Sequence, residues 1–277
     1  MTAFRSLPRF AMTACFVFLV AGLAACAKQP DPQTNLAKAG ARANMGDFTV
    51  FAVEAEPGTN LVQPTVLYKN RDISQPGDPV REMTPGKIVL NFPQPGCESM
   101  KVETFTGGAN CCFGYYLLTT CPDGPHAAYI EPQNGGVGDA EQKLRAYPID
   151  DPAFFYYEPQ NQTGGTKLSL SRVDSPRITR FLVFDNGVWR ADHAGELAAA
   201  YKALLDQARK DKTMNKAARA ISMAYYSLMA GGKTAAAERL LKQALPREYT
   251  HLTPAIMKDI QTSVSSFNPV RSLTVTQ

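Results

Sequence analysis

Four closely spaced cysteines are the residues whose chemistry the sequence indicates most clearly. They fall within a stretch of 25 residues, at Cys97, Cys111, Cys112 and Cys121. Cysteines at this density either ligate zinc or form disulfides. They do not provide the paired C-x-x-C ligands of a zinc site, and no histidine stands at ligand spacing in the sequence. We therefore expect disulfides, with no metal and no cofactor.

Hydrolytic chemistry finds little support in the sequence. A serine hydrolase needs an activated serine, a histidine base and an acid that orients the base. There is no G-x-S-x-G motif, and the three histidines, His126, His193 and His251, stand near a turn, at a sheet-to-helix junction and before the last expected helix. Glu54 and Glu56 would share one face of a strand. They could act as the acid/base pair of a glycoside hydrolase, or they could simply be two carboxylates on a solvated face. The sequence identifies no catalytic residue.

The N-terminal segment has the pattern of an export signal. A short basic region with Arg5 and Arg9 precedes an apolar run from Phe10 to Ala25. At about 16 residues this run is shorter than the roughly 20 that a helix needs to cross a bilayer. It also ends at small residues rather than at a basic flank. We therefore expect residues 1–25 to be a signal peptide.

The last residues of the apolar run add a second feature. Leu23-Ala24-Ala25-Cys26 resembles the lipobox of bacterial lipoproteins. The resemblance implies that Cys26 becomes the first residue, carrying a diacylglycerol and, in many species, a further acyl chain such as palmitate. Two or more chains anchor a protein stably, because each buried methylene contributes ~0.8 kcal/mol. The alternative is an ordinary signal peptide that happens to be followed by a cysteine.

This resemblance sets the expected compartment and partners. It implies a lipid-anchored protein of the cell envelope, and we expect the outer membrane, facing the periplasm. Lys28, in place of an aspartate directly after Cys26, leaves sorting between membranes open. Loss of Arg5 and Arg9 with the signal would lower the net charge from +4 to +2. So small an excess does not favour nucleic acid binding, so the expected partners are the membrane and an envelope protein or glycan.

The pairing of the four cysteines depends on the predicted strands. If residues 101–105 and 113–118 form a hairpin, opposite residues have numbers that sum to about 217 or 218, and Cys97 faces Cys121. Cys111 and Cys112 would then bond to each other, although adjacent Cα atoms are about 3.8 Å apart and disulfides usually span about 4.4–6.8 Å. Alternatively, Cys111 and Cys112 point to opposite faces, and one bonds Cys97 and the other Cys121. The hairpin geometry slightly favours Cys97–Cys121.

The segment around these cysteines carries a weaker resemblance. Residues 105–116 are similar to a Gly-Gly-Ala-x-Cys-Cys segment of exported bacterial β-rich proteins, some of them propeller-like. In that form a histidine stands where this chain has Asn110, and an Asp-rich loop follows. No Asp-x-Asp-Gly loop occurs between Cys121 and Asp150. The resemblance therefore implies an exported sheet, and calcium binding is not carried over.

The elements that must position these residues are mostly strands, followed by helices. Asn186-Gly187 between apolar residues predicts a two-residue type I′ hairpin, with Trp189 in the core. Expected strands fall at 48–53, 65–68, 87–92, 101–105, 113–118, 154–157, 167–170 and 178–184. Expected helices fall at 196–209, 216–230 and 234–245, with Thr234 as a cap, and another begins near Thr253. Residues 196–260 contain 11 basic and 6 acidic side chains. This basic excess is consistent with a solvated helix face or with a surface that faces an anionic membrane.

The predicted organisation is α+β, with an antiparallel β-rich domain, as a sandwich, barrel or partial propeller, followed by a C-terminal helical hairpin or bundle. The expected segments are a signal peptide (1–25), a lipidated linker (26–45), a β-rich domain (46–192), a helical region (193–267) and a tail (268–277). We expect a binding or structural role. The alternative is a periplasmic hydrolase or an enzyme-inhibitor module. An exposed aromatic patch at 154–157 would favour binding, and a pocket with a histidine and a carboxylate would favour an enzyme.

Overall fold

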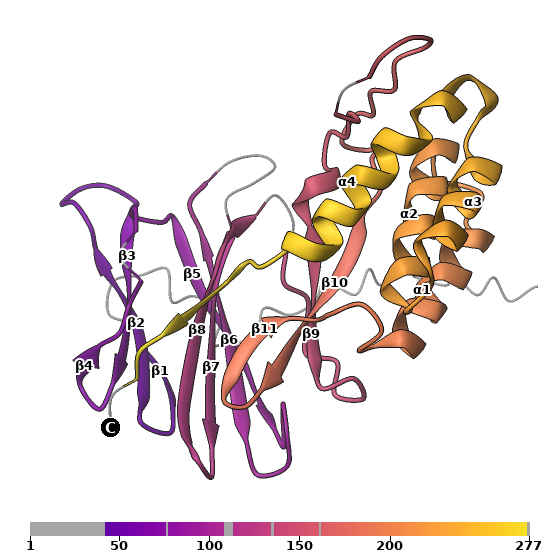
Figure 1. The fold of residues 1–277 in the computed structure, drawn as a ribbon. Coiled ribbons are helices and arrows are strands. Elements are labelled where there is room, and N and C mark those ends of the chain that lie inside the picture. The colour runs from indigo at the N-terminus through magenta and orange to yellow at the C-terminus, as the bar shows by residue number, and fades with distance from the viewer. Residues whose placement is uncertain (1–41, 76, 108–112, 134–135, 161, 276–277) are drawn as a thin grey trace, which may run out of the picture. The chain divides into compact units, whose positions relative to one another are not determined.

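The computed structural model describes residues 42–75, 77–107, 113–133, 136–160 and 162–275. Within these ranges the chain is α+β, with twelve strands in three antiparallel sheets and four α-helices toward the C-terminus (Figure 1). The predicted class, a β-rich antiparallel part followed by helices, is therefore confirmed.

The three sheets are open and antiparallel, with strand orders β1-β2-β3-β4, β12-β8-β7-β6-β5 and β11-β10-β9. The first contains β1 (Arg42–Met45), β2 (Phe48–Glu54), β3 (Val62–Tyr68) and β4 (Arg71–Asp72). The second contains β5 (Glu82–Leu90), β6 (Glu98–Phe105), β7 (Phe113–Cys121), β8 (Gly124–Gln133) and β12 (Val270–Leu273). The third contains β9 (Ala146–Asp151), β10 (Ile178–Asp185) and β11 (Val188–Ala191).

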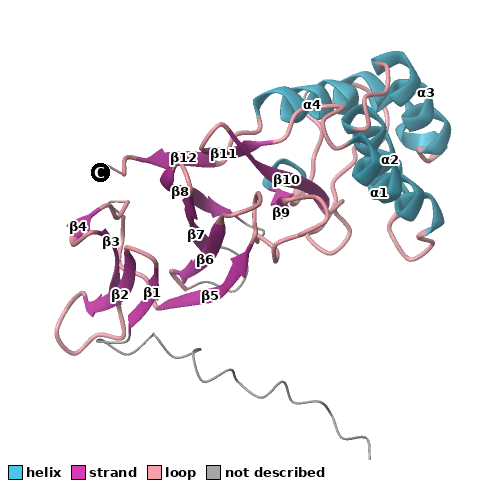
Figure 2. Cartoon of the chain, turned by 90° about the horizontal axis from the view of Figure 1, so that it is seen from below, coloured by secondary structure: helices cyan, strands magenta, loops and turns pink. Residues whose placement is uncertain are grey.

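The sheets and helices are stacked as layers, and a separate apolar core fills each interface (Figure 2). The central five-stranded sheet is buried on both sides. Tyr116 and Leu118 of β7 pack with residues of the first sheet, whereas Tyr115 and Leu117 pack with residues of the third. Side chains alternate between the two faces of a strand. Burial of both faces explains why β7 is apolar almost without interruption.

The third sheet carries the helices on its other face. They are α1 (Ala198–Lys210), α2 (Lys216–Met229), α3 (Thr234–Ala244) and α4 (Thr253–Ser266), close to the predicted ranges. Asn215 caps α2 by accepting from the backbone N–H groups of Ala217 and Ala218, and Gly231, at φ 84°, follows its end. The predicted cap of α3 is wrong: Lys233 occupies the cap position, and Thr234 is the first helical residue.

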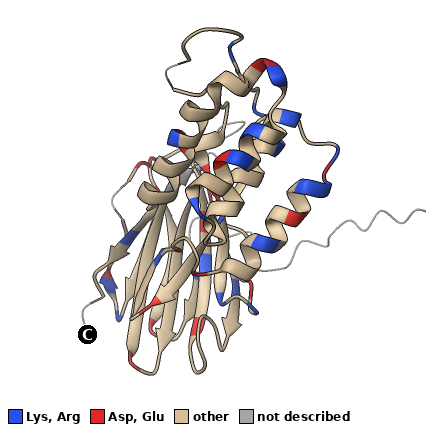
Figure 3. Ribbon diagram, turned by 45° about the vertical axis from the view of Figure 1, so that its right-hand side comes forward, with Lys and Arg blue, Asp and Glu red and all other residues tan. Residues whose placement is uncertain are grey.

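Lysines and arginines are spread along the helices, with acidic residues between them (Figure 3).

Two short 3₁₀ helices complete the layer, at Pro152–Phe154 and Arg247–Leu252. None of the helices in the described ranges combines the length and the apolar character needed to cross a membrane.

The predicted hairpin at Asn186-Gly187 is confirmed. Both residues have positive φ, at 49° and 81°, as a type I′ turn requires. The turn joins β10 to β11, with Asp185 opposite Val188. Trp189 follows on the buried face, is only 2% exposed, and donates its indole N–H to the Thr119 hydroxyl at 3.0 Å. The prediction that Trp189 is a core residue is therefore confirmed.

Two predicted strands, 154–157 and 167–170, are absent, because neither segment pairs with a sheet in the structure. Asp151 ends β9 and accepts from the backbone N–H of Ala153, which starts a 3₁₀ turn at Pro152. Tyr156 then takes a positive φ of 50°, which breaks any extended run. The apolar residues in this region are buried by the helical layer rather than by strand pairing.

The chain returns to the sheets after its last helix. Residues 270–273, placed in the predicted tail 268–277, form β12 and pair with β8 from Val270–Ile130 to Leu273–Ala127. Local sequence patterns did not indicate this strand, because it is short and lies at an edge of the sheet.

Candidate functional site

The first candidate site is built on the hairpin of β6 and β7. Their paired residues have numbers that sum to 218, from Phe105–Phe113 to Glu98–Thr120, in agreement with the predicted hairpin. This register brings Cys97 opposite Cys121, and the structure joins them by a disulfide with Cα atoms 4.2 Å apart. Cys111, Cys112 and the predicted lipidation residue Cys26 lie outside the described residues. The proposed vicinal bond between Cys111 and Cys112 therefore stays a prediction.

A tight turn places two further polar side chains beside this disulfide. Cys121 ends β7 and is paired with Gly124 at the start of β8, so Pro122 and Asp123 form the turn between them. Thr119 pairs with His126, and Thr119 and Cys121 are two residues apart in one strand. Cys121 and His126 therefore share a face of the sheet, because side chains of a strand alternate.

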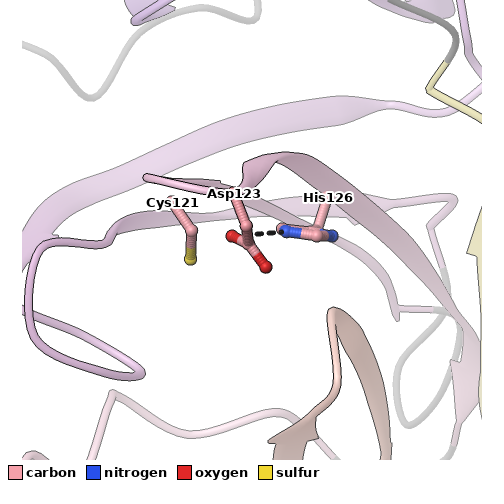
Figure 4. A group of neighbouring side chains, drawn as sticks. All are labelled: Cys121, Asp123 and His126. Carbon is pink, nitrogen blue, oxygen red and sulfur yellow. Dashed lines mark hydrogen bonds and ion pairs between the residues drawn. The ribbon is translucent and has the colours of Figure 1, made fainter.

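Cys121, Asp123 and His126 each offer one ligand-type atom, and these atoms all lie within 4.8 Å of one another (Figure 4). The His126 Nε2 is 3.3 Å from the Asp123 Oδ1. The His126 ring packs edge-on against Phe184, and its side chain is 19% exposed. Linear spacing in the sequence indicated no histidine ligand near the cysteines. This expectation is wrong, because the fold brings His126 close to Cys121. The sequence feature that indicates this grouping is the spacing Cys-x-Asp-x-x-His around a Pro-Asp-Gly turn.

The second candidate site is a polar network buried between the third sheet and the helices. Arg180 of β10 donates from Nε to the Asp192 carboxylate at 3.1 Å and from Nη2 to the Asp192 carbonyl at 2.7 Å. Its Nη1 donates to the Tyr225 hydroxyl at 2.9 Å, and its guanidinium lies 4.9 Å from the centre of the Phe267 ring. Arg180 and Asp192 are each only 1% exposed. The network therefore holds a charged pair away from water.

The electrostatics of this pair follow from its burial. Burial raises the pKa of the Asp192 carboxyl, because the charged form loses its hydration, and Arg180 opposes this shift. Burial and then the nearby Asp192 carboxylate raise the pKa of Tyr201. The Asp192 carboxylate also accepts from the backbone N–H of Phe181 at 3.3 Å, and the Tyr201 hydroxyl lowers the pKa of this carboxyl less than the charge of Arg180 does. Arg180 is thus the main support of the buried carboxylate.

The same network reaches a surface pocket through Asp151. Both the Tyr225 hydroxyl, at 2.8 Å, and the Ser263 hydroxyl donate to the Asp151 Oδ2. Asp151 and Ser263 border an open pocket of about 340 Å³ at the junction of β9, the end of α4 and the segment that leads to β12. The other lining residues are Pro152, Ala153, Ser266, Phe267, Asn268 and Pro269. Among the residues that the structure describes, no histidine lines this pocket.

The remaining candidates from the sequence are dispersed. His193 and His251 are exposed, and His251 lies against Gly165. β2 ends at Glu54, whose carboxylate accepts from the backbone N–H of Gly58, and Glu56 lies in the turn beyond the strand. The expectation that Glu54 and Glu56 share a strand face is therefore wrong.

The aromatic run 154–157 does not form an exposed patch. Phe154 and Tyr157 are buried, and Tyr156 is the member that is largely exposed. Tyr157 donates its hydroxyl to Asp259 of α4 at 2.8 Å, which ties the run to the helical layer. This segment is therefore chiefly structural.

Comparison of the chain with family models, with curated proteins and with solved structures gave no match.

Proposed function

We propose that this chain is a lipoprotein of the bacterial cell envelope, anchored through Cys26, whose folded part binds a partner rather than catalysing a reaction. The observation that carries the proposal is the Leu23-Ala24-Ala25-Cys26 segment after an apolar run of export-signal length. We place the protein in the outer membrane with its folded part facing the periplasm.

The disulfide supports this compartment. Disulfides persist in the periplasm and in other oxidising compartments, whereas the cytosol keeps thiols reduced. Cys97 and Cys121 are paired and nearly buried, at 2% and 7% exposure. A cross-strand disulfide at the end of a hairpin fits a protein that functions outside the cytosol.

The pocket beside Asp151 supports a binding role. Asp151 accepts hydrogen bonds from Ala153, Tyr225 and Ser263, so its carboxylate is already engaged and is a poor general base. Ser266 and Asn268 are exposed at the same pocket, and the Ser266 hydroxyl, which donates to the Thr262 carbonyl at 2.7 Å, can still accept through its oxygen. We propose that this pocket receives a hydroxyl- or amine-bearing group of the envelope partner, which these acceptors would bind.

The anchor is tested by expressing the full chain in bacteria fed an alkyne-tagged fatty acid. The wild type is expected to incorporate the tag and to sediment with membranes. Cys26→Ser removes the acylated thiol and is expected to abolish both, whereas Cys15→Ser within the leader leaves both unchanged. Equal labelling of wild type and Cys26→Ser, or no labelling of either, would reject the anchor.

The binding role is tested by crosslinking in intact envelopes, followed by mass spectrometry of the captured molecules. Ala153→Trp fills the pocket from its exposed rim, and Val53→Trp places the same side chain on an exposed position of β2. Capture that Ala153→Trp abolishes and Val53→Trp preserves supports the pocket. Capture that neither variant affects would place the partner elsewhere and reject this site.

A further inference from the structure

We propose that reduction of the Cys97–Cys121 disulfide creates a zinc site in which Cys97, Cys121, Asp123 and His126 bind one Zn²⁺ ion. The inference goes beyond the proposed anchoring and binding role and does not depend on it. It starts from the close grouping of Cys121, Asp123 and His126 at the β7–β8 turn, with Cys97 bonded to Cys121 across the hairpin.

The donor set suits zinc. Zinc takes four ligands in a tetrahedron, drawn from cysteine sulfur, histidine nitrogen and carboxylate oxygen. At metal–ligand distances of about 2.0–2.3 Å, the donor atoms of such a tetrahedron lie about 3.3–3.8 Å apart. The Cys121, Asp123 and His126 atoms already lie within 4.8 Å of one another, and His126 Nε2 is 3.3 Å from Asp123 Oδ1. Once the disulfide is broken, the two sulfurs are free to separate to this spacing, and side-chain rotations can close the remaining gaps between the donor atoms.

The backbone holds these donors in place independently of the disulfide. Cys97 directly precedes β6, and its backbone carbonyl accepts from the Phe92 N–H at 3.2 Å, while Cys121 pairs with Gly124 in the β7–β8 ladder. His126 is fixed in β8 opposite Thr119, with Phe184 against its ring. Strand pairing at Cys121 and His126, the tight turn at Asp123 and the loop hydrogen bonds of Cys97 therefore keep the four residues close when the sulfur–sulfur bond is broken.

The surroundings also suit an ion. Asp123 is 61% exposed and His126 is 19% exposed at the side chain, which gives the ion access from solvent. The Gln94 side-chain amide lies 3.8 Å from the Cys121 sulfur, where it can donate to a thiolate. Such outer contacts orient ligands and tune metal affinity.

The chemistry makes oxidation and metal binding mutually exclusive. A dithiol reductant breaks the Cys97–Cys121 bond by thiol–disulfide exchange, gives two thiols here and becomes a disulfide itself. Zn²⁺ then forms two zinc–sulfur bonds and releases the two thiol protons, while neutral His126 and the Asp123 carboxylate supply the remaining bonds. In the oxidised protein both sulfurs are tied to each other, which leaves only the aspartate and the histidine.

The test is a titration of the purified protein with Co²⁺ and with Zn²⁺, with and without prior reduction by a dithiol that is removed before the metal is added. Co²⁺ accepts the same tetrahedral ligands and absorbs visible light when thiolates bind it. The reduced protein is expected to bind one equivalent with a thiolate–cobalt spectrum that Zn²⁺ abolishes. The oxidised protein is expected to show no such spectrum.

Variants separate this site from the other two cysteines. Cys97→Ser/Cys121→Ser retains Cys111 and Cys112 and is expected to lose the spectrum entirely. His126→Ala and Asp123→Ala, which keep every thiol, are expected to weaken binding at least tenfold, since even outer-shell losses cost about 10–100-fold. His251→Ala is the matched control and is expected to leave binding unchanged.

Three results would overturn the proposal: no cobalt spectrum after reduction, equal binding by the oxidised protein, or unchanged binding in Cys97→Ser/Cys121→Ser. Asp123 is exposed in a turn, so Asp123→Ala provides a ligand variant that keeps the fold if His126→Ala does not. Circular dichroism of each reduced variant establishes that the fold is present when binding is scored.

Discussion

Replacement of Arg180 tests the role of the buried network most sharply. Arg180→Met keeps much of the volume of the side chain but removes its three hydrogen bonds, to the Asp192 carboxylate, the Asp192 carbonyl and the Tyr225 hydroxyl. It leaves Asp192, 1% exposed, as a buried carboxylate without its counter-ion. Breaking one side of a buried pair typically costs about 3–5 kcal/mol. We expect the free energy of unfolding to fall by about that amount at pH 8.

The loss should depend on pH with a defined sign. Burial already raises the pKa of Asp192, and Arg180 opposes that shift, so the pKa rises further in Arg180→Met. Because one pKa unit corresponds to about 1.36 kcal/mol, a loss of about 3 kcal/mol corresponds to a further rise of about two units. The unfolded carboxyl titrates near about 3.9. The folded state therefore loses stability as pH rises from that value through the raised pKa, and the deficit should shrink toward pH 4.5.

The assay is urea unfolding followed by two signals. Fluorescence of Trp189, the single tryptophan, reports on the buried β layers, and far-ultraviolet circular dichroism reports on the helices. Arg180→Met/Asp192→Asn removes both charges and is expected to recover at least about 1 kcal/mol relative to Arg180→Met, because no ion is left unpaired. A deficit below about 1 kcal/mol, or the same deficit at pH 4.5 and pH 8, would refute this reasoning.

Three further substitutions probe the disulfide, the hairpin and the helix-to-sheet contact. Cys97→Ser/Cys121→Ser opens a loop with a sequence separation of 24, and loop entropy predicts that the free energy of unfolding falls by about 3.4 kcal/mol. In urea unfolding, a dithiol should lower the free energy of unfolding of the wild type by a similar amount and leave that of the variant unchanged. Gly187→Ala places a Cβ 2.8 Å from the His126 ring at φ 81°, whereas Gly58→Ala meets nothing within 4 Å at φ 78°. Both variants carry the cost of a positive φ, about 1–2 kcal/mol. A lower melting temperature for Gly187→Ala than for Gly58→Ala would therefore measure the clash with His126, and equal melting temperatures would contradict the clash. Tyr226→Phe removes the acceptor of the Thr179 backbone N–H at 3.0 Å and should cost about 1–3 kcal/mol in the same urea assay; a change within error would show that water replaces this contact.

The sequence predicted those parts of the fold that local patterns determine. The Asn186-Gly187 turn, the register of the β6–β7 hairpin and the α1–α4 ranges each follow from a few neighbouring residues. The register favoured Cys97–Cys121 only slightly over bonds from Cys97 and Cys121 to Cys111 and Cys112, and the structure contains the Cys97–Cys121 bond.

The sequence did not predict the features that depend on distant contacts. Residues 154–157 have the composition of a strand, but Pro152 and the Asp151 cap start a 3₁₀ turn, and the helices bury Phe154 and Tyr157. β12 is four residues long and is stabilised by a strand about 140 residues away in sequence.

The two candidate sites show the same division. Linear spacing indicates no histidine ligand near the cysteines, whereas a tight turn folds His126 back beside Cys121. The Arg180 network joins two strands to α2 and α4, and no motif marks such a cluster. Each of its members resembles an ordinary strand or helix residue when it is read alone.

The central proposal, that Cys26 anchors the chain to a bilayer outside the cytosol, is tested most directly by intact-mass analysis of the protein purified from bacterial membranes. The account predicts a mature chain that lacks residues 1–25, carries acyl groups on its first residue and contains the Cys97–Cys121 bond. An unacylated chain that retains residues 1–25, or a soluble form with reduced thiols, would contradict it.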